Sequence, residues 1–231
     1  SANLIALTSI VQNPKYDLKA GDEVIVPAVS WSTTFFPVQQ HGLVLKFVDI
    51  DKDTLNIDCN LVEQAITEKT KAVFAVNLLG NSCELADLKR ICDNRGLVLI
   101  EDNCESFGAS HQNKYCATWG TAGTFSFFFS HHLQTMEGGM IVTDDQDLYD
   151  YMRSLRAHGW VRDIGDNSSL YTKSGDPFED SFRFVLPGYC VRPLEMSGAV
   201  GQVQLSKAND MLDQRIVNSK IYHHFFDNVD Y

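Results

Sequence analysis

Short apolar runs separated by polar stretches dominate the first two thirds of the chain. Six of these runs are too short for most helices and are rich in Val, Ile and Phe, which predicts buried β-strands. The predicted strands are Glu23–Pro27, Leu43–Val48, Ala72–Val76, Leu97–Glu101, Gly123–Phe129 and Met140–Thr143.

Between these runs, apolar side chains recur at helical spacing. Strands that alternate with helices predict an α/β fold with a mostly parallel central sheet and helices on both faces. Ligands of such sheets bind beyond the carboxyl ends of the strands. The predicted apolar faces are Leu61, Ala65 and Ile66 in residues 60–66, Leu85, Leu88 and Cys92 in residues 83–92, and Leu148, Met152 and Leu155 in residues 145–156.

The pattern changes in the last third of the chain. Residues 163–180 are rich in Gly, Ser, Asp and Asn without a period, which predicts a long surface loop. Residues 193–230 are helical again in their spacing.

Composition narrows the possible partners. The 231 residues carry a formal net charge of -11, which argues against nucleic acid or an anionic membrane, because such binding needs clustered Lys and Arg. No apolar stretch of about 18 residues and no charged-then-apolar leader is present, so neither a membrane span nor a secretory signal is predicted. The six cysteines include no Cys-x-x-Cys pair and are typical of reduced thiols in the cytoplasm.

Candidate chemistry gathers after two of the predicted strands. Glu101 and Asp102 end one strand, where a carboxylate can hold a protonated pyridinium nitrogen or simply cap the next helix. Ser126 lies in another strand and can bond a phosphate oxygen, although a serine there can also be only a small residue. The pair Gly138-Gly139 permits a tight turn, beside a ligand or not.

His131 follows Ser126 where a lysine would be expected in a pyridoxal phosphate site. An imidazole takes and gives protons but has no primary amine, so it cannot form a Schiff base. A cofactor at this position would not be tethered, and elimination is favoured over transamination.

These motifs, in this order and at these spacings, resemble the fold-type I pyridoxal phosphate enzymes that act on nucleotide sugars, the StrS/DegT-type sugar aminotransferases. The resemblance implies a cofactor-binding large domain over residues 1–190 with a truncated start, and a helical connection over residues 191–231 toward a largely absent C-terminal small domain. The motifs are Ser1-Ala-Asn-Leu4, Asp22–Pro27, Glu101-Asp102, Phe125–Phe127, Glu137–Gly139 and Pro187–Pro193.

Within that family, a histidine in place of the lysine marks the dehydratases. The resemblance therefore implies a 3-dehydratase of a nucleotide 4-keto-6-deoxy sugar, with pyridoxal or pyridoxamine phosphate as cofactor and glutamate as co-substrate, releasing ammonia and 2-oxoglutarate. One branch adds an iron–sulfur cluster, for which Cys104 could be a ligand. No cysteine occurs between His158 and Cys190, so we expect no cluster.

The resemblance also implies the cofactor contacts. Trp31 would stack on the pyridine ring, although it could be a buried core aromatic. Asp102 would pair with the ring nitrogen, and Ser1, Ala2 and Ser126 would hold the phosphate.

Three further positions have open roles. Glu105 would lie beside the ring hydroxyl or serve as a helix-start carboxylate. His158 assists the elimination or is structural. Cys190 stands where the family usually has an asparagine that reaches the phosphate in the partner subunit of a homodimer, and a thiol is a poor hydrogen-bond donor. The histidines expected to be structural are His132, His223 and His224.

Two other functions stay open. One is an ordinary sugar aminotransferase with a displaced lysine, for which Lys114 and Lys173 are the only lysines between Arg95 and Lys207. The other is a catalytically inactive, sugar-binding relative.

Overall fold

The computed structural model describes residues 1–166, 168–227 and 229. Two compact units divide the chain. Unit 1 comprises residues 1–126 and 139–192, and unit 2 comprises residues 127–138 and the described part of 193–231. The predicted domain division after residue 190 remains a prediction about the whole protein.

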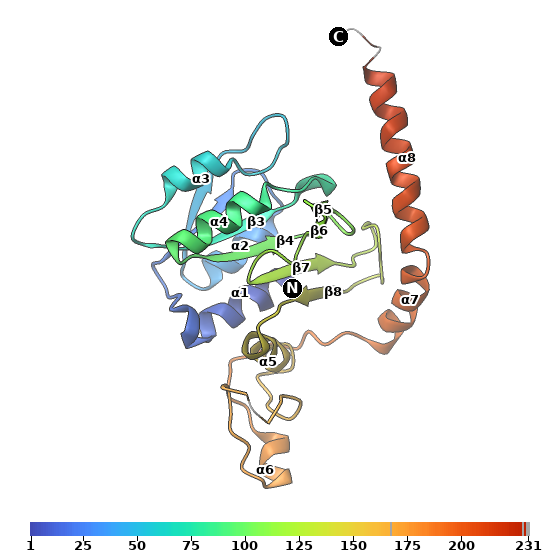
Figure 1. Cartoon of the computed structure of the whole chain (residues 1–231). Coiled ribbons are helices and arrows are strands. Elements are labelled where there is room, and N and C mark those ends of the chain that lie inside the picture. Colours follow the sequence, from blue (N-terminus) through green and yellow to red (C-terminus); the bar gives the residue numbers. More distant parts are fainter. Residues whose placement is uncertain (167, 228, 230–231) are drawn as a thin grey trace. The chain divides into compact units, whose positions relative to one another are not determined.

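A six-stranded sheet with the order β2-β1-β3-β4-β7-β8 forms the centre of unit 1 (Figure 1). Only β8 runs antiparallel to its neighbour, so the predicted mostly parallel sheet is confirmed. A two-stranded hairpin of β5 (Ser110–His111) and β6 (Lys114–Tyr115) accompanies it. The sheet strands are β1 (Glu23–Pro27), β2 (Val44–Val48), β3 (Thr70–Val76), β4 (Val98–Asp102), β7 (Ala122–Ser126) and β8 (Gly139–Val142).

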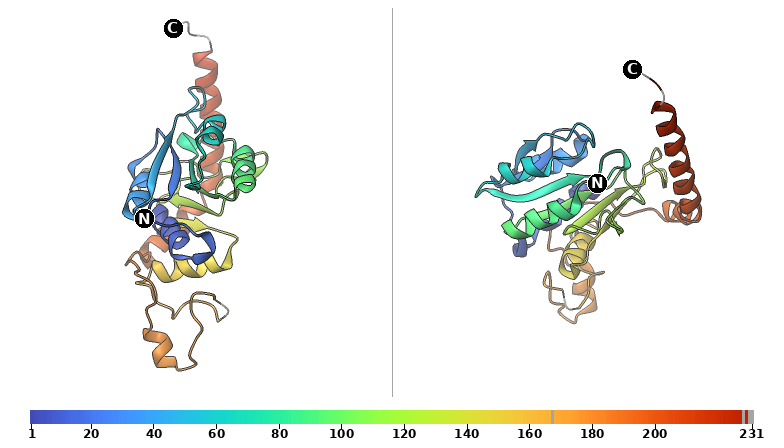
Figure 2. Two further views of the ribbon diagram at one scale, coloured as in Figure 1. Left: turned by 90° about the vertical axis from the view of Figure 1, so that its left-hand side faces the viewer. Right: turned by 45° about the horizontal axis from the view of Figure 1, so that its top comes forward.

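Helices cover both faces of the sheet (Figure 2). Because side chains alternate along a strand, Val24 and Val26 of β1 join one core and Ile25 joins the other. The first core contains α1 (Ala2–Gln12), α2 (Ser32–Gln40) and α5 (Gln146–Leu155), and the second contains α3 (Cys59–Ala65) and α4 (Leu85–Arg95).

The predicted apolar faces are confirmed for α4 and α5. For α3 the prediction is wrong at Leu61, whereas Ala65 and Ile66 pack against the second core as predicted. Val62 is the buried residue of α3, whereas Leu61 is exposed. The helix begins at Cys59 because the Asp58 carboxylate accepts hydrogen bonds from the N–H groups of Asn60 and Leu61.

Sequence patterns did not predict α1 and α2. Six consecutive α1 residues, from Ile5 to Ile10, are buried, so no amphipathic stripe marks the helix. In α2, Pro37 lies inside the helix and β-branched residues open it. Short 3₁₀ turns follow α1 at Pro14–Tyr16 and β3 at Leu78–Gly80.

The predicted loop over residues 163–180 is shorter than expected, because α6 (Pro177–Phe182) begins inside it. The Asp176 carboxylate accepts from the N–H groups of Phe178 and Glu179, and Pro177 occupies the first helical position, where no N–H is needed. Residue 167 of this stretch lies outside the described residues.

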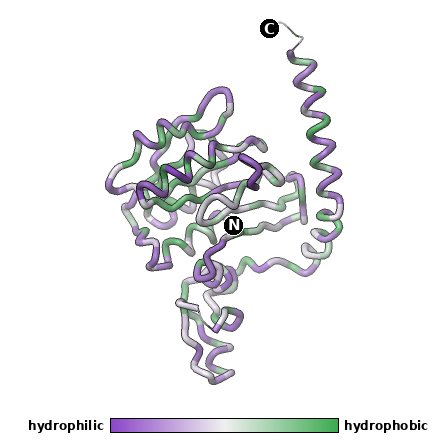
Figure 3. The backbone as a smooth tube through the Cα atoms, in the orientation of Figure 1, coloured by the Kyte–Doolittle hydropathy of each residue, from purple (hydrophilic) through white to green (hydrophobic). Residues whose placement is uncertain are grey.

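Unit 2 contains α7 (Glu195–Leu205) and α8 (Ala208–Phe226), so the predicted helical stretch is two helices. Positions 228 and 230 of that prediction lie outside the described residues. Along α8, hydrophobic and hydrophilic stretches alternate (Figure 3), and Ile216, Ile221 and Phe225 are exposed. Across the described part of the chain, no helix combines the length and the apolar character needed to cross a membrane.

Candidate active site

Parallel strands bring the predicted site residues of unit 1 to one edge of the sheet. Asp102 and Ser126 are the last residues of the neighbouring strands β4 and β7. Ser1 caps α1, and Ala2 begins it beside β8, since a Cβ on Gly139 would lie 3.5 Å from the Ala2 Cβ. The helix start and the two strand ends are therefore neighbouring features of the same edge.

The Asp102 carboxylate is 4% exposed and is held from three elements. Its Oδ2 accepts from Asn3 Nδ2 of α1 at 2.6 Å and from Thr34 Oγ1 of α2 at 2.9 Å. Its Oδ1 accepts from the backbone N–H of Cys104 at 3.1 Å. All three of these partners donate hydrogen bonds to the carboxylate, from α1, from α2 and from the backbone after β4.

Sequence reasoning missed Asn3 and Thr34 as partners of Asp102. The only signal for Asn3 was its place in the Ser1-Ala-Asn motif, and nothing marked Thr34. Both side chains are buried, Asn3 at 3% exposed and Thr34 at 0% exposed. Buried polar side chains need hydrogen-bond partners, and the Asp102 carboxylate is the partner that Asn3 and Thr34 share.

The neighbouring Glu101 serves a different purpose. Its two oxygens accept from the backbone N–H groups of Ala117, Trp119 and Gly120, each at 2.7 Å. Burial raises the pKa of Glu101, and the three N–H donors oppose that rise. Both Glu101 oxygens thus hold the 117–120 loop, so Asp102 is the carboxylate that can meet a ligand at this strand end.

Glu105 is tied to the turn after β3. One of its carboxylate oxygens, Oε2, accepts from the backbone N–H of Leu79 at 2.8 Å. Leu79 has a φ of 53° and is 72% exposed, an unusual conformation for a leucine. Glu105 thus fixes an exposed turn near the end of β3, and no helix begins at this residue, so its reading as a helix-start carboxylate is wrong.

Trp31 is not a core aromatic, because it is 73% exposed. It is the N-cap residue of α2, and its carbonyl accepts from the N–H of Thr34 at 3.1 Å. The same helix turn therefore carries an exposed indole and a buried hydroxyl that reaches Asp102. An exposed indole beside a polar strand end is suited to stacking on a planar ligand.

The glycine pair after Glu137 serves close packing rather than a left-handed turn, since neither glycine has a positive φ. Within unit 2, a Cβ on Gly138 would lie 2.4 Å from Thr135 Oγ1. Within unit 1, a Cβ on Gly139 would lie 2.9 Å from the Phe125 carbonyl oxygen. A side chain at position 138 would therefore displace Thr135, and one at position 139 would press on the backbone of β7 at Phe125.

His131 belongs to unit 2, in the connection between β7 and β8. Its backbone N–H donates to the Phe128 carbonyl at 3.0 Å, and its ring meets the Phe128 ring edge to face at 6.4 Å between centroids. The side chain is half-buried, and Ser126 lies five residues before it in the chain. These contacts fix the local turn that carries the imidazole.

His158 and Cys190 lie together in unit 1, where Ala157 pairs with Cys190 in an isolated β-bridge. His158 is exposed and has a φ of 66°, which a histidine adopts rarely and at some cost. Cys190 is exposed as well. Strain at an exposed imidazole is more typical of a functional residue than of a structural one.

The six cysteines are free. Burial raises the pKa of the Cys104 thiol, and the charge and hydrogen bond of Asp102 raise it further. In the described residues, no three His, Cys, Asp or Glu side chains gather as a metal site would require.

Comparisons with known proteins agree on one family. The model of the "DegT/DnrJ/EryC1/StrS aminotransferase family" matches residues 1–231. A GDP-4-keto-6-deoxy-D-mannose 3-dehydratase of Yersinia pseudotuberculosis is 52% identical over 232 residues, covering 100% of this chain and 59% of the relative. The chain thus spans about three fifths of the length of that relative.

Two solved structures of a GDP-4-keto-6-deoxymannose-3-dehydratase are similar throughout. One holds a trapped PLP-glutamate geminal diamine and superposes with a TM-score of 0.95 at 50% identity, covering 100% of this chain and 60% of the other. The second is a double variant in which an adjacent serine and histidine are replaced by asparagine and lysine, with a TM-score of 0.96 at 49% identity, covering 100% and 61%. The predicted α/β fold of pyridoxal phosphate enzymes is confirmed.

Proposed function

Since the chain belongs to the DegT/DnrJ/EryC1/StrS aminotransferase family, we propose that it carries the cofactor site of a glutamate-dependent 3-dehydratase of GDP-4-keto-6-deoxy-D-mannose. One observation carries the proposal. The dipeptide Ser130-His131 lies where the family has its lysine, and the similar dehydratase is known in a variant whose adjacent serine and histidine became asparagine and lysine.

The residues of unit 1 fit pyridoxal phosphate. A buried carboxylate at a strand end suits a protonated ring nitrogen, and Asp102 has that character. The exposed indole of Trp31 suits the face of the ring. Ser1 and Ala2 lie at the start of α1 and Ser126 ends β7, and hydroxyl and N–H groups at a helix start suit a phosphate.

In this proposal the bound cofactor supplies an amine for the 4-keto group of the sugar and a ring that takes up electrons while the 3-hydroxyl leaves. Asp102 would hold the protonated ring nitrogen, and Glu105 would lie beside the ring hydroxyl. His131 moves one proton when glutamate reloads the cofactor and another during elimination. An imidazole suits both steps, because its ordinary pKa of about 6.5 lies near neutral pH.

The absence of an amine at position 131 determines the product. No lysine recaptures the cofactor, so the nitrogen leaves as ammonia after the sugar has lost its 3-hydroxyl. The overall change is balanced: the keto sugar and glutamate give the 4-keto-3,6-dideoxy sugar, 2-oxoglutarate and ammonia. Glutamate is thereby the reductant of carbon 3.

A displaced lysine receives little support as an alternative. Lys114 Nζ lies 4.8 Å from the centre of the Trp119 ring, and Lys173 Nζ pairs with Asp166 Oδ1 at 3.0 Å. Both amines are therefore engaged in contacts with other side chains. An aminotransferase that uses either lysine would have to break these contacts.

The proposal includes a homodimer in the cytoplasm. The exposed Cys190 is the position at which the family reaches the partner subunit's cofactor, and it would face that phosphate with a thiol instead of an amide. The six free cysteines suit a reducing compartment.

The test is a product analysis. The protein is incubated with pyridoxal phosphate, glutamate and GDP-4-keto-6-deoxy-D-mannose, and we expect equal amounts of ammonia and 2-oxoglutarate with a sugar that is lighter by one oxygen atom. The His131→Asn variant serves as the control and should release neither product. A stable 4-amino sugar would contradict the dehydratase and favour an aminotransferase.

A further inference from the structure

The strongest unassigned feature is the set of buried polar contacts behind Asp102. Asn3 uses its whole amide: Nδ2 donates to Asp102 Oδ2 at 2.6 Å and to the Thr33 carbonyl at 3.2 Å, and Oδ1 accepts from Thr124 Oγ1 at 2.6 Å. The Thr33 carbonyl can only accept a hydrogen bond, so the amide nitrogen of Asn3 faces Thr33 and Asp102, and the amide oxygen faces the Thr124 hydroxyl of β7.

Thr34 is oriented in a similar way. Its single hydroxyl hydrogen goes to Asp102 Oδ2 at 2.9 Å. The Thr34 oxygen lies 2.9 Å from Ser30 Oγ, which must then be the donor in that pair. Two fixed donors therefore meet at one oxygen of the carboxylate, and a proton could not be accommodated there without breaking one of them.

We propose that Asn3 and Thr34 are positioning residues that hold the Asp102 carboxylate ionised and leave Oδ1 as the oxygen for the cofactor ring nitrogen. The inference rests on the proposed function, because it needs a pyridinium as the partner of Asp102. In the pair formed by Asp102 and the ring, the proton can lie on nitrogen or on Oδ1. Donors to Oδ2 stabilise the carboxylate and so keep the proton on the ring nitrogen.

The network also connects the cofactor contacts with one another. Asn3 follows Ala2, Thr34 lies one helix turn after Trp31, and Thr124 lies two residues before Ser126. Ala2, Trp31 and Ser126 therefore each lie within three residues of a side chain that is bonded to Asp102, directly or through Asn3. Loss of one donor should therefore change the protonation of the cofactor ring nitrogen and not only the stability of the fold.

The Cys104 thiol is a further neighbour of the carboxylate. It forms a hydrogen bond with Asp102, and burial is the first cause of its raised pKa. The thiol therefore stays protonated near neutral pH and adds no charge that could compete with the ring.

The test uses pyridoxal phosphate labelled with nitrogen-15 in the ring, bound to the protein at neutral pH. We expect the wild-type nitrogen signal at the protonated position. In Thr34→Val and Asn3→Leu, the ratio of protonated to unprotonated ring nitrogen should fall about tenfold. Each variant removes one hydrogen bond to an ionised acceptor, the Asp102 carboxylate. Thr34→Ser restores the hydroxyl and should give the wild-type signal.

Thr8→Val is the matched control, because Thr8 is 1% exposed and bonds His41 Nε2 at 2.7 Å, away from Asp102. Should Asn3→Leu fail to fold in a thermal melt, the Thr34→Val and Thr34→Ser pair decides alone. Bound cofactor with the same nitrogen signal in Thr34→Val as in wild type overturns this inference and leaves the proposed function standing. A wild-type protein that binds no pyridoxal phosphate overturns both.

Discussion

The backbone N–H of His158 donates to the carbonyl oxygen of Tyr189 at 2.8 Å. This bond joins the His158-Gly159-Trp160 turn to the Pro187-Gly188-Tyr189 segment, two motifs that stand far apart in the sequence. It holds His158 at a φ of 66° with its side chain exposed. The pairing explains why both motifs carry a glycine, because the two backbones approach closely.

Gly159 should tolerate no side chain. A Cβ there would lie 1.8 Å from the Leu186 carbonyl oxygen, whereas a Cβ on Gly175 would meet nothing within 4 Å. The two glycines have nearly equal φ values, 83° and 84°, so the strain of a positive φ is the same in both. We expect Gly175→Ala to cost about 1 kcal/mol and Gly159→Ala about 2–4 kcal/mol in urea unfolding. Equal losses would contradict the contact with Leu186.

His158 itself can be tested without disturbing this turn. Asparagine tolerates a positive φ, so we expect His158→Asn to keep the wild-type melting temperature. The rate of ammonia release should fall about tenfold or more, since the variant removes an imidazole that can transfer protons. The same exchange at His223, an exposed residue of α8, should leave the rate unchanged. If His158→Asn keeps the full rate, His158 is structural.

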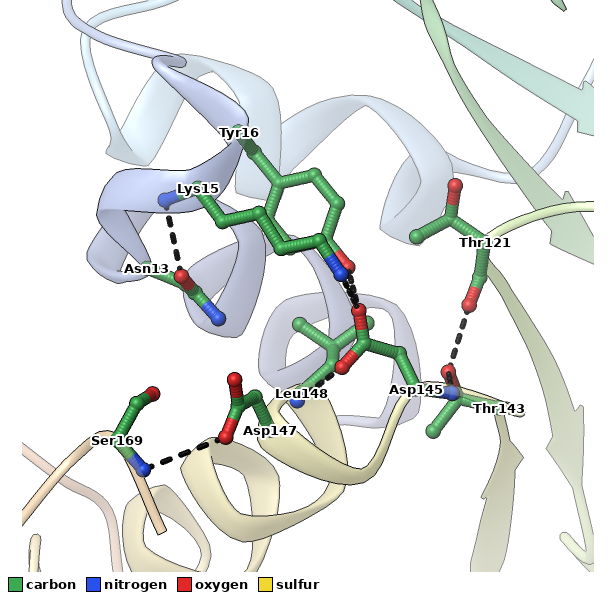
Figure 4. A network of polar contacts seen from close by, with 9 residues as sticks. All are labelled: Asn13, Lys15, Tyr16, Thr121, Thr143, Asp145, Asp147, Leu148 and Ser169. Atoms are coloured by element: carbon green, nitrogen blue, oxygen red, sulfur yellow. Dashed lines mark hydrogen bonds and ion pairs between the residues drawn. The ribbon is translucent and has the colours of Figure 1, made fainter.

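Asp145 should make the stability depend on acid. Burial raises the pKa of its carboxyl, but bonds from Lys15, from Tyr16 at 2.8 Å and from the Leu148 N–H outweigh this and lower it to about 2 (Figure 4). A carboxyl whose pKa is lower in the folded than in the unfolded protein stabilises the fold. This stabilisation is complete above the unfolded pKa and is lost as the pH falls toward the folded pKa.

The expected loss from Asp145 therefore occurs between about pH 4 and pH 2 and amounts to about 1–2 kcal/mol, discounted because Lys15 is mostly exposed. Urea unfolding of wild type and Asp145→Asn at several pH values measures it. The difference between the two proteins should shrink as the solution becomes more acidic, and a constant difference would refute the assigned contacts.

The sheet could be predicted from sequence because its strands are continuous apolar runs, and the run at residues 23–27 matches β1 residue for residue. The helix α1 could not be predicted, since both its faces are apolar or buried. Asp102 could be selected because it ends a strand, and His131 because it replaces an expected lysine.

The partners of Asp102 lay beyond sequence reasoning. Asn3 and Thr34 are 99 and 68 residues away from it along the chain, and only the packing of α1 and α2 on the sheet brings them together. Neither a period nor a spacing encodes such contacts. The sequence could not predict that Trp31 is exposed either, because an aromatic residue after a strand can pack into the core or face solvent.

The most direct test of the central claim, a cofactor that is not tethered and is served by His131, is intact-protein mass measurement after borohydride reduction in the presence of pyridoxal phosphate. Wild type should gain no mass, and His131→Lys should gain the mass of one reduced cofactor. Lysine at the adjacent position, in His132→Lys, should gain none. Addition of the cofactor to the wild-type protein would mean that another lysine holds it and would contradict the account.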